Sequence, residues 1–209
     1  MSLRTTLGER LAYGAGNVPG TIVTAGAGFL MFFFTDVAAL PAAAVGSFIL
    51  AVKVWDACWD LWVGRWVDRH RGRHGQCRPF LFAGALLFPL AMSAVFWLPP
   101  VGAAGRLVWA VASYAALQMV FSVIMIPYQS LPVLQSDDEA DRAQLAGSQA
   151  LWTFVTVMVV NGATMALVGV LGQGDAVQGF WRTMSAWGLL GGRSEEHTSE
   201  LQSRLHLVC

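Results

Sequence analysis

Three charged residues stand in an otherwise apolar stretch, and their types and spacing suit the binding of a cation. Lys53, Asp56 and Asp60 lie within the apolar run 42–66. A helix would place all three on one narrow stripe, with Lys53 and Asp56 three positions apart and within pairing distance. A charge at the centre of a membrane helix costs about 2.5–3.5 kcal/mol on insertion scales, so charges kept there indicate a function.

The three charges sum to minus one, which suits one monovalent cation or one proton. Carboxylate oxygens are good ligands for hard cations. We predict a cation-coupling site at Asp56 and Asp60, with Lys53 as the charge partner and sodium or a proton as the ion. The alternative is a buried ion-pair lock with no role toward a substrate. We expect no organic cofactor and no metal beyond a possible sodium ion at this site.

The composition indicates a membrane protein. Hydrophobic residues make up 56% of the chain and charged residues only 12%, whereas ordinary globular proteins carry roughly 25% charge. The three cysteines follow no disulfide or zinc-binding spacing. The main cationic cluster lies between apolar runs, so we expect no nucleic-acid partner. The sequence contains no zinc-type His-Glu pair, nucleophile elbow or phosphate-binding glycine loop, and we predict that the protein is not an enzyme.

Five apolar runs have the roughly 20 residues that a spanning helix needs, and a sixth begins. The predicted spans are 11–34, 42–66, 80–98, 107–134, 147–171 and 180–192, the last one truncated. We therefore predict an all-α membrane protein in which residues 1–192 form an N-terminal transmembrane bundle. From Arg193 the chain is abruptly polar and looks like the in-frame translation of a sequencing adapter. We interpret residues 193–209 as a non-native read-through tail, and the alternative is a real hydrophilic tail.

The distribution of arginine predicts the orientation in the membrane. The segment between the second and third spans holds four arginines, whereas the segment between the first and second spans holds neither lysine nor arginine. Because an excess of Lys and Arg marks cytoplasmic loops, we place the N terminus and the arginine-rich segment in the cytoplasm. Because successive spans cross the membrane in opposite directions, the acidic segment 137–142 is predicted to lie in the cytoplasm as well. The predicted location is the lipid bilayer of a bacterial inner membrane.

The arginine-rich segment is also a candidate conformational latch. A carboxylate near a helix terminus can cap a helix or pair with arginine, and such a pair can hold one conformation. A plain topology signal from positive charge is the alternative, and both can hold. The candidate latch residues are Gly64, Asp68, Arg69, Arg71 and Arg73.

Two further polar stripes are candidates for lining a substrate cavity. In the fourth span, polar residues and one methionine are spaced four, three and four apart and share a face. The first span has a second polar stripe of this kind. Packing between helices is the alternative for both stripes, since Ser, Thr, Asn and Gln often bridge membrane helices. The cavity candidates are Tyr13, Asn17 and Thr21 in the first span and Gln118 and Gln129 in the fourth.

Several short motifs, and the order in which they occur along the chain, resemble those of one transporter family. The pattern Gly64-x-x-x-Asp68-Arg69 with its arginines resembles the cytoplasmic loop signature of major facilitator transporters. More narrowly, the chain resembles the N-terminal half of the glycoside–pentoside–hexuronide:cation symporters of the melibiose permease type. The matching pieces are Tyr13-Gly14-x-Gly16, Phe34-Thr35-Asp36, Trp55-Asp56-Ala57-x-x-Asp60, Arg78-Pro79-Phe80 and Ile126-Pro127-Tyr128-x-x-Leu131.

The resemblance implies roles for individual residues. Asp56 and Asp60 match the pair that coordinates the coupling cation, and Ser122 matches a hydroxyl position near it. Two departures stand out, because Met125 replaces the family's carboxylate in the fourth span and the sugar-binding aspartate of the first span falls on Gly20 or Thr21. Two carboxylates instead of three favour protons over sodium, and the missing first-span acid argues against a galactoside.

The implied protein is the N-terminal six-helix half of a twelve-helix major facilitator fold. Its implied function is cation-coupled symport of a sugar or related polar solute by alternating access about a midplane site. The implied partners are a glycoside or sugar and the missing C-terminal six-helix half. A different class of function stays open, in which a membrane assembly or sensor protein keeps the fold without transporting. Met125 in place of an acid motivates that alternative.

Overall fold

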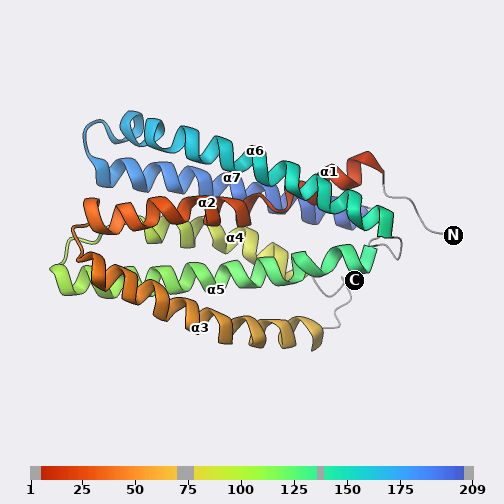
Figure 1. The fold of residues 1–209 in the computed structure, drawn as a ribbon, viewed down its shortest axis with the longest axis horizontal. Helices are drawn as coiled ribbons and strands as arrows, with labels where there is room; N and C mark the ends of the chain where they lie inside the picture. Colours follow the sequence, from red (N-terminus) through yellow and green to blue (C-terminus); the bar gives the residue numbers. More distant parts are fainter. Residues whose placement is uncertain (1–5, 70–77, 136–138, 205–209) are drawn as a thin grey trace.

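The computed structural model describes residues 6–69, 78–135 and 139–204, and the regular elements within them are all helical (Figure 1). This confirms the all-α prediction. The elements are α1 (Leu7–Ala15), α2 (Val18–Phe32), the π-helical turn η1 (Phe33–Val37), α3 (Ala42–Arg69), α4 (Arg78–Val95), α5 (Ala103–Gln135), α6 (Glu139–Gly172) and α7 (Ala176–Arg204).

The long helices run up and down along one axis (Figure 1). The start of α1 and the ends of α3 and α5 lie at one end of the bundle, and the α2–α3, α4–α5 and α6–α7 connections lie at the other. This is the arrangement that the predicted parity of the spans requires. Four stretches are long and apolar enough to cross a membrane, namely Arg10–Val37, Ala42–Arg69, Ala103–Ser130 and Glu139–Gly172, while Pro79–Val95 is shorter.

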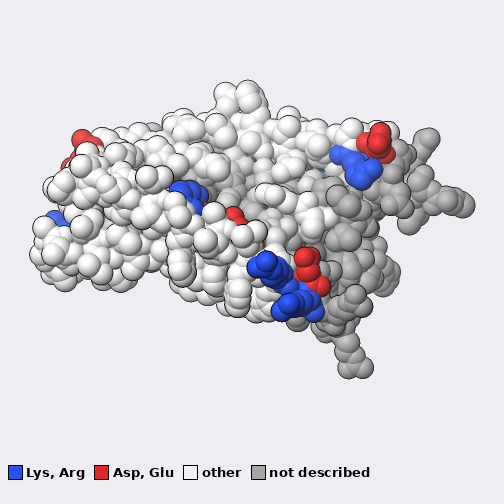
Figure 2. Space-filling model, turned by 60° about the horizontal axis from the view of Figure 1, so that its bottom comes forward, with Lys and Arg blue, Asp and Glu red and all other residues white. Residues whose placement is uncertain are grey.

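Packing divides the helices into an inner group and an outer group. The apolar stretches of the first and fourth spans are 44% and 39% buried, whereas those of α3 and α6 are each only 22% buried. α3 lies mainly on α5, and α4 packs against both α5 and α7. The face shown in Figure 2 is mostly uncharged, with charged side chains in a few small groups. An apolar exterior of this kind suits a helix bundle in lipid.

The first span is not the single helix that was predicted, because it breaks between α1 and α2. The break falls at Gly16 and Asn17, where the Asn17 N–H bonds to the carbonyl of Gly14 in a tight turn. Pro19 stands at the start of α2, where its missing N–H costs no helical hydrogen bond. The Asn17 side chain donates to Thr153 of α6 at 2.7 Å, so a neighbouring helix fixes the break.

Two other boundaries differ from the predicted ones by more than four residues. α6 begins at Glu139 instead of residue 147, so part of the expected acidic loop is helical. Its first turn holds Glu139 and Asp141, and acidic residues are favourable there because they face the positive end of the helix dipole. α7 continues to Arg204, beyond the predicted end at residue 192, through Glu, Gln and Arg, which are good helix formers. The non-native origin of the tail stays an interpretation.

Candidate functional site

The interface between α3 and α5 positions the central carboxylate of Asp56. The two helices run in the same direction (Figure 1). The indole N–H of Trp59 donates to the carbonyl of Met119 at 3.2 Å, and Val63 and Val67 are buried further along α3. These contacts fix the register of α3 on α5, so Asp56 faces a defined set of α5 side chains.

Asp56 accepts hydrogen bonds from three side chains on two helices. Its Oδ2 atom lies 3.1 Å from Nε2 of Gln118 and 3.3 Å from Nζ of Lys53. Its Oδ1 atom lies 3.1 Å from Oγ of Ser122. We call these four residues the Asp56 cluster. Sequence spacing predicted the Lys53 pair, and the resemblance placed Ser122 nearby, whereas the bond from Gln118 was not predicted.

The three donors differ in strength. Gln118 and Ser122 are 1% and 3% exposed, and a hydrogen bond to a charged group contributes about 1.5–3 kcal/mol. The Lys53 side chain is 51% exposed, and an ion pair in such a setting contributes only about 0–1 kcal/mol. The α5 side chains therefore hold the carboxylate firmly, and Lys53 is the donor that can leave at low cost.

The oxygen atoms around Asp56 fit a small hard cation. Oγ of Ser122 lies 3.1 Å from Oδ1 of Asp56, and the Gln118 amide beside Oδ2 offers its own oxygen when the amide is turned over. The Ser122 hydroxyl also lies 3.1 Å from the main-chain carbonyl oxygen of Gln118. Its one proton can turn to that carbonyl, which leaves its lone pairs free for a cation. Oxygen donors of this kind suit sodium, and the carboxylate alone suits a proton.

Asp60 lies one helical turn beyond Asp56 and is not part of this cluster. Its side chain is half-buried. It makes no hydrogen bond or ion pair with any residue that the structure describes. The described parts of the chain likewise contain no group of three or more His, Cys, Asp and Glu side chains that could hold a metal ion. The predicted pair of carboxylates is thus one coordinated carboxylate and one without partners among the described residues.

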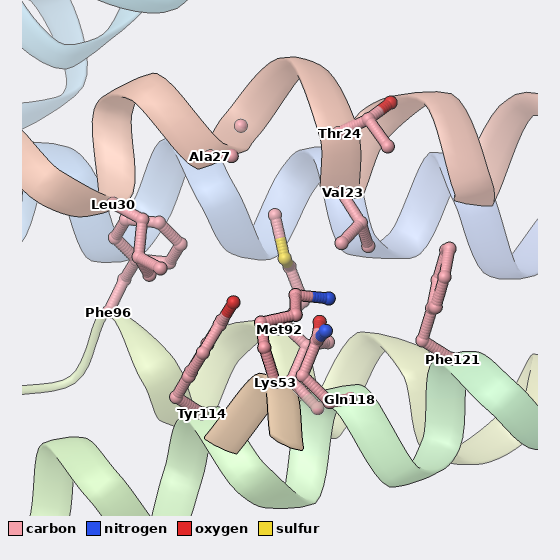
Figure 3. A pocket seen from close by; sticks show the side chains of 12 residues that line it. Val23, Thr24, Ala27, Leu30, Lys53, Met92, Phe96, Tyr114, Gln118 and Phe121 are labelled. Atoms are coloured by element: carbon pink, nitrogen blue, oxygen red, sulfur yellow. The ribbon is translucent and has the colours of Figure 1, made fainter. Parts of the chain in front are cut away.

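A cavity of about 220 Å³ opens beside the Asp56 cluster between α2, α4 and α5 (Figure 3). Figure 3 shows the Lys53 nitrogen and the Gln118 amide close together, with the Tyr114 hydroxyl directed into the same space. The Thr24 hydroxyl instead bonds to backbone carbonyls of its own helix. The remaining walls are mostly apolar and include Val23, Leu30, Met92, Phe96, Leu117 and Phe121.

The other cavity candidates lie elsewhere. Tyr13 stacks on Tyr128 with ring centroids 5.0 Å apart. Asn17 and Thr21 are buried and bonded to each other, and Gln129 is exposed. The described residues that line the 220 Å³ cavity include the fifth candidate, Gln118, but none of these four. Their role in lining a substrate cavity stays a prediction.

Met125, one of the two departures from the family pattern, packs against Gly20, which is one of the two residues on which the family's first-span aspartate can fall. A Cβ atom added to Gly20 would lie 2.8 Å from Sδ and 2.9 Å from Cε of Met125. Met125 is 8% exposed and belongs to the apolar core. Where the resemblance expects an acid on α5, this protein has an apolar side chain that packs over Gly20, one of the two candidate positions for the first-span acid.

The candidate latch residues are only partly described. Asp68 and Arg69 are exposed at the end of α3, while Arg71 and Arg73 fall outside the described residues. Gly64 has open space where a Cβ atom would point, so packing within the described part of the chain does not require glycine there. The latch stays a prediction.

Sequence reasoning missed Tyr114, whose hydroxyl points into the cavity (Figure 3). The signal was available, because Tyr114 precedes Gln118 by four residues and so extends the same polar stripe by one turn. A tyrosine in an apolar run reads as an ordinary packing residue until its neighbours are known. Its ring indeed contacts Phe48 of α3, so it serves packing as well.

Comparisons with known proteins point to one family. Residues 12–191 match the sequence model described as MFS/sugar transport protein. The chain is 32% identical to a putative glycoside/cation symporter from Escherichia coli (strain K12), over 89% of this chain and 41% of the relative. It is 35% identical to a glucuronide carrier protein homolog from the same organism, over 79% of this chain and 36% of the relative. An isoprimeverose transporter from Lactiplantibacillus pentosus is 28% identical, over 70% of this chain and 31% of the relative. The chain thus spans less than half the length of each.

Proposed function

This chain belongs to the MFS/sugar transport protein family, and we propose that it forms the N-terminal part of a cation-coupled symporter. The complete protein would carry a sugar or related polar solute across a bacterial inner membrane, with its N terminus in the cytoplasm. Transport would proceed by alternating access, in which this bundle and a second six-helix bundle rock about a central site. The relatives support the solute class, since they include a putative glycoside/cation symporter and an isoprimeverose transporter.

The observation that carries the proposal is the position of Asp56 between two inner donors and a cavity. Gln118 and Ser122 hold the carboxylate from α5, and Lys53 reaches from the same carboxylate to the cavity wall. A sodium ion or a proton at Asp56 would therefore change the charge that a solute in the cavity meets. Cation and solute would then raise each other's affinity by the same factor.

The test is uptake by the complete protein against a panel of solutes, with sodium and proton gradients varied separately. We expect one gradient to stimulate uptake of at least one polar solute in cells that make the protein. Asp56→Cys is expected to abolish the stimulation while the protein stays in the membrane. Unchanged stimulation in both Asp56→Cys and Asp60→Cys would overturn the assignment of the coupling site.

A second candidate function is supported by the contact between Gly20 and Met125. A protein that had lost acids at both positions could keep the fold as a membrane assembly or sensor protein without transporting. The remainder of the reading frame separates the two functions. A second set of six spans supports the symporter, and a soluble signalling domain supports the alternative.

A further inference from the structure

Lys53 holds a position that the symport proposal does not yet explain. It is the only charged side chain among the described residues that line the cavity. The same ammonium lies 3.3 Å from Oδ2 of Asp56. One side chain therefore takes part in both the carboxylate cluster and the wall of the cavity.

The geometry allows this ammonium to exchange partners. The lysine side chain is a flexible four-carbon stem, and half of it is exposed. Figure 3 shows its nitrogen beside the Gln118 amide, with the Tyr114 hydroxyl directed into the same space. Rotation about side-chain bonds would turn the ammonium from Asp56 toward the centre of the cavity without any movement of α3.

Charge balance indicates when the exchange would occur. With neither ligand bound, Lys53 and Asp56 neutralise each other. A cation on Asp56 takes over that carboxylate, so the ammonium is left without a counter-charge among the described residues that line the cavity. An anionic group on the solute restores the balance, because Lys53 then pairs with the solute while the cation pairs with Asp56.

The surroundings offer Lys53 no other acid among the residues lining the cavity that the structure describes. Where the resemblance expects a second acid on α5, Met125 packs over Gly20. Asp60 is seven residues from Lys53 on the same helix, about 10 Å along the axis at 1.5 Å per residue. The exchange therefore has one acceptor in the protein and one place for a second acceptor in the cavity.

We propose that Lys53 is an exchangeable cation that holds the place of the coupling ion on Asp56 and that the solute carries an anionic group which receives the displaced ammonium. The solute class is a sugar or polyol acid with a carboxylate or sulfonate. Lys53 then acts as the specificity residue and as the link between the two ligands. This inference rests on the proposed symport at Asp56.

The first test measures cation binding to the purified complete protein in the absence of solute. The probe is the ion, sodium or proton, that drives uptake. Lys53→Gln removes the internal competitor, so its affinity for this cation is expected to rise about tenfold, within the usual range of coupling between two sites. Lys53→Arg keeps the competing charge and is the matched control, with an affinity close to that of the wild type. A Lys53 that serves only to stabilise the fold predicts an unchanged or weaker affinity in Lys53→Gln, and that result overturns the proposal.

The second test measures uptake of matched acid and neutral solutes by the same proteins. The pairs are glucuronate with glucose and gluconate with glucitol, together with a short hydroxyalkyl sulfonate. We expect the wild type to accumulate acids and Lys53→Gln to lose that accumulation, with retention in Lys53→Arg. Accumulation of neutral sugars alone by the wild type overturns the proposal.

Cation-coupled symport at Asp56 and partner exchange by Lys53 can be disproved separately. If Asp56→Cys abolishes cation stimulation but Lys53→Gln leaves both cation affinity and solute preference unchanged, the symport proposal holds and the exchange by Lys53 is wrong. If no gradient stimulates uptake of any solute, the symport proposal itself is wrong.

Discussion

Asp56 and Asp60 lie one turn apart on the same helix face, yet their surroundings differ. Asp56 is 7% exposed and accepts hydrogen bonds from three side chains. Asp60 is half-buried and has no such partner in the part of the chain that the structure describes. Two of the three donors to Asp56 come from α5, which runs in the same direction as α3 (Figure 1). Ser122 meets Asp56, and about one turn later α5 carries Met125. Helical spacing decides which face a carboxylate shares, and the neighbouring helix decides what it can bind.

The largest expected effect comes from neutralising each carboxylate in turn in the complete protein. Asp56→Asn removes the only charge that Gln118 and Ser122 surround, so cation-stimulated uptake is expected to disappear. Asp60→Asn removes a charge without partners in the described residues, so the rate of uptake is expected to fall by less than tenfold. A tenfold fall would correspond to about 1.4 kcal/mol of activation free energy. Initial rates at saturating cation measure both. Equal loss in the two variants would break the contrast and make the aspartates a true pair.

A smaller effect is expected from the hydroxyl that faces Asp56. Ser122→Ala deletes one oxygen ligand and one hydrogen bond to a charged group, which contributes about 1.5–3 kcal/mol. The cation affinity is therefore expected to fall by at least tenfold, as measured by the cation concentration for half-maximal uptake. Ser122→Thr keeps the hydroxyl and is the control. An alanine variant with wild-type affinity would remove Ser122 from the site.

The contact between α2 and α5 is expected to affect stability more than coupling. Gly20→Ala places a Cβ atom 2.8 Å from Sδ of Met125, and overpacking of this kind costs about 1–3 kcal/mol, the lower end being expected for a flexible methionine. Thermal unfolding of the complete protein in detergent measures the loss. Adding Met125→Ala is expected to relieve the overlap, so a double variant without any such coupling would contradict the packing described here.

The smallest effect is expected at the cavity wall. Tyr114→Phe removes a hydroxyl that has no hydrogen-bond partner among the described residues, and it keeps the ring that contacts Phe48. Cation affinity in the absence of solute is expected to change by less than about twofold, because Asp56 keeps all three of its hydrogen-bond donors in this variant. The solute concentration for half-maximal uptake is expected to rise. A large loss of cation affinity would extend the cluster to Tyr114.

Much of this arrangement could be predicted from residue spacing. The interval of three between Lys53 and Asp56 predicted their pairing, and the interval of four between Gln118 and Ser122 put both on one face of a helix. The order of the long helices followed from the positions of the apolar runs, and four of these stretches are long and apolar enough to cross a membrane. These features depend on helical geometry alone.

The remaining features depend on contacts between helices, which spacing within one helix does not contain. The hydrogen bonds that distinguish Asp56 from Asp60 come from Gln118 and Ser122 of α5. The break at Gly16 and Asn17 depends on Thr153 of α6, more than 130 residues away in the sequence. The contact of Gly20 with Met125 joined two departures that sequence reasoning had treated separately.

The most direct test of the role of Asp56 is the number of cations carried per solute by the complete protein in sealed vesicles. The Asp56 cluster holds one carboxylate for a cation, so one sodium ion or one proton is expected per solute. In Asp56→Asn the number is expected to fall to zero while the solute still equilibrates across the membrane. An Asp56→Asn protein that still carries one cation with each solute would contradict the account.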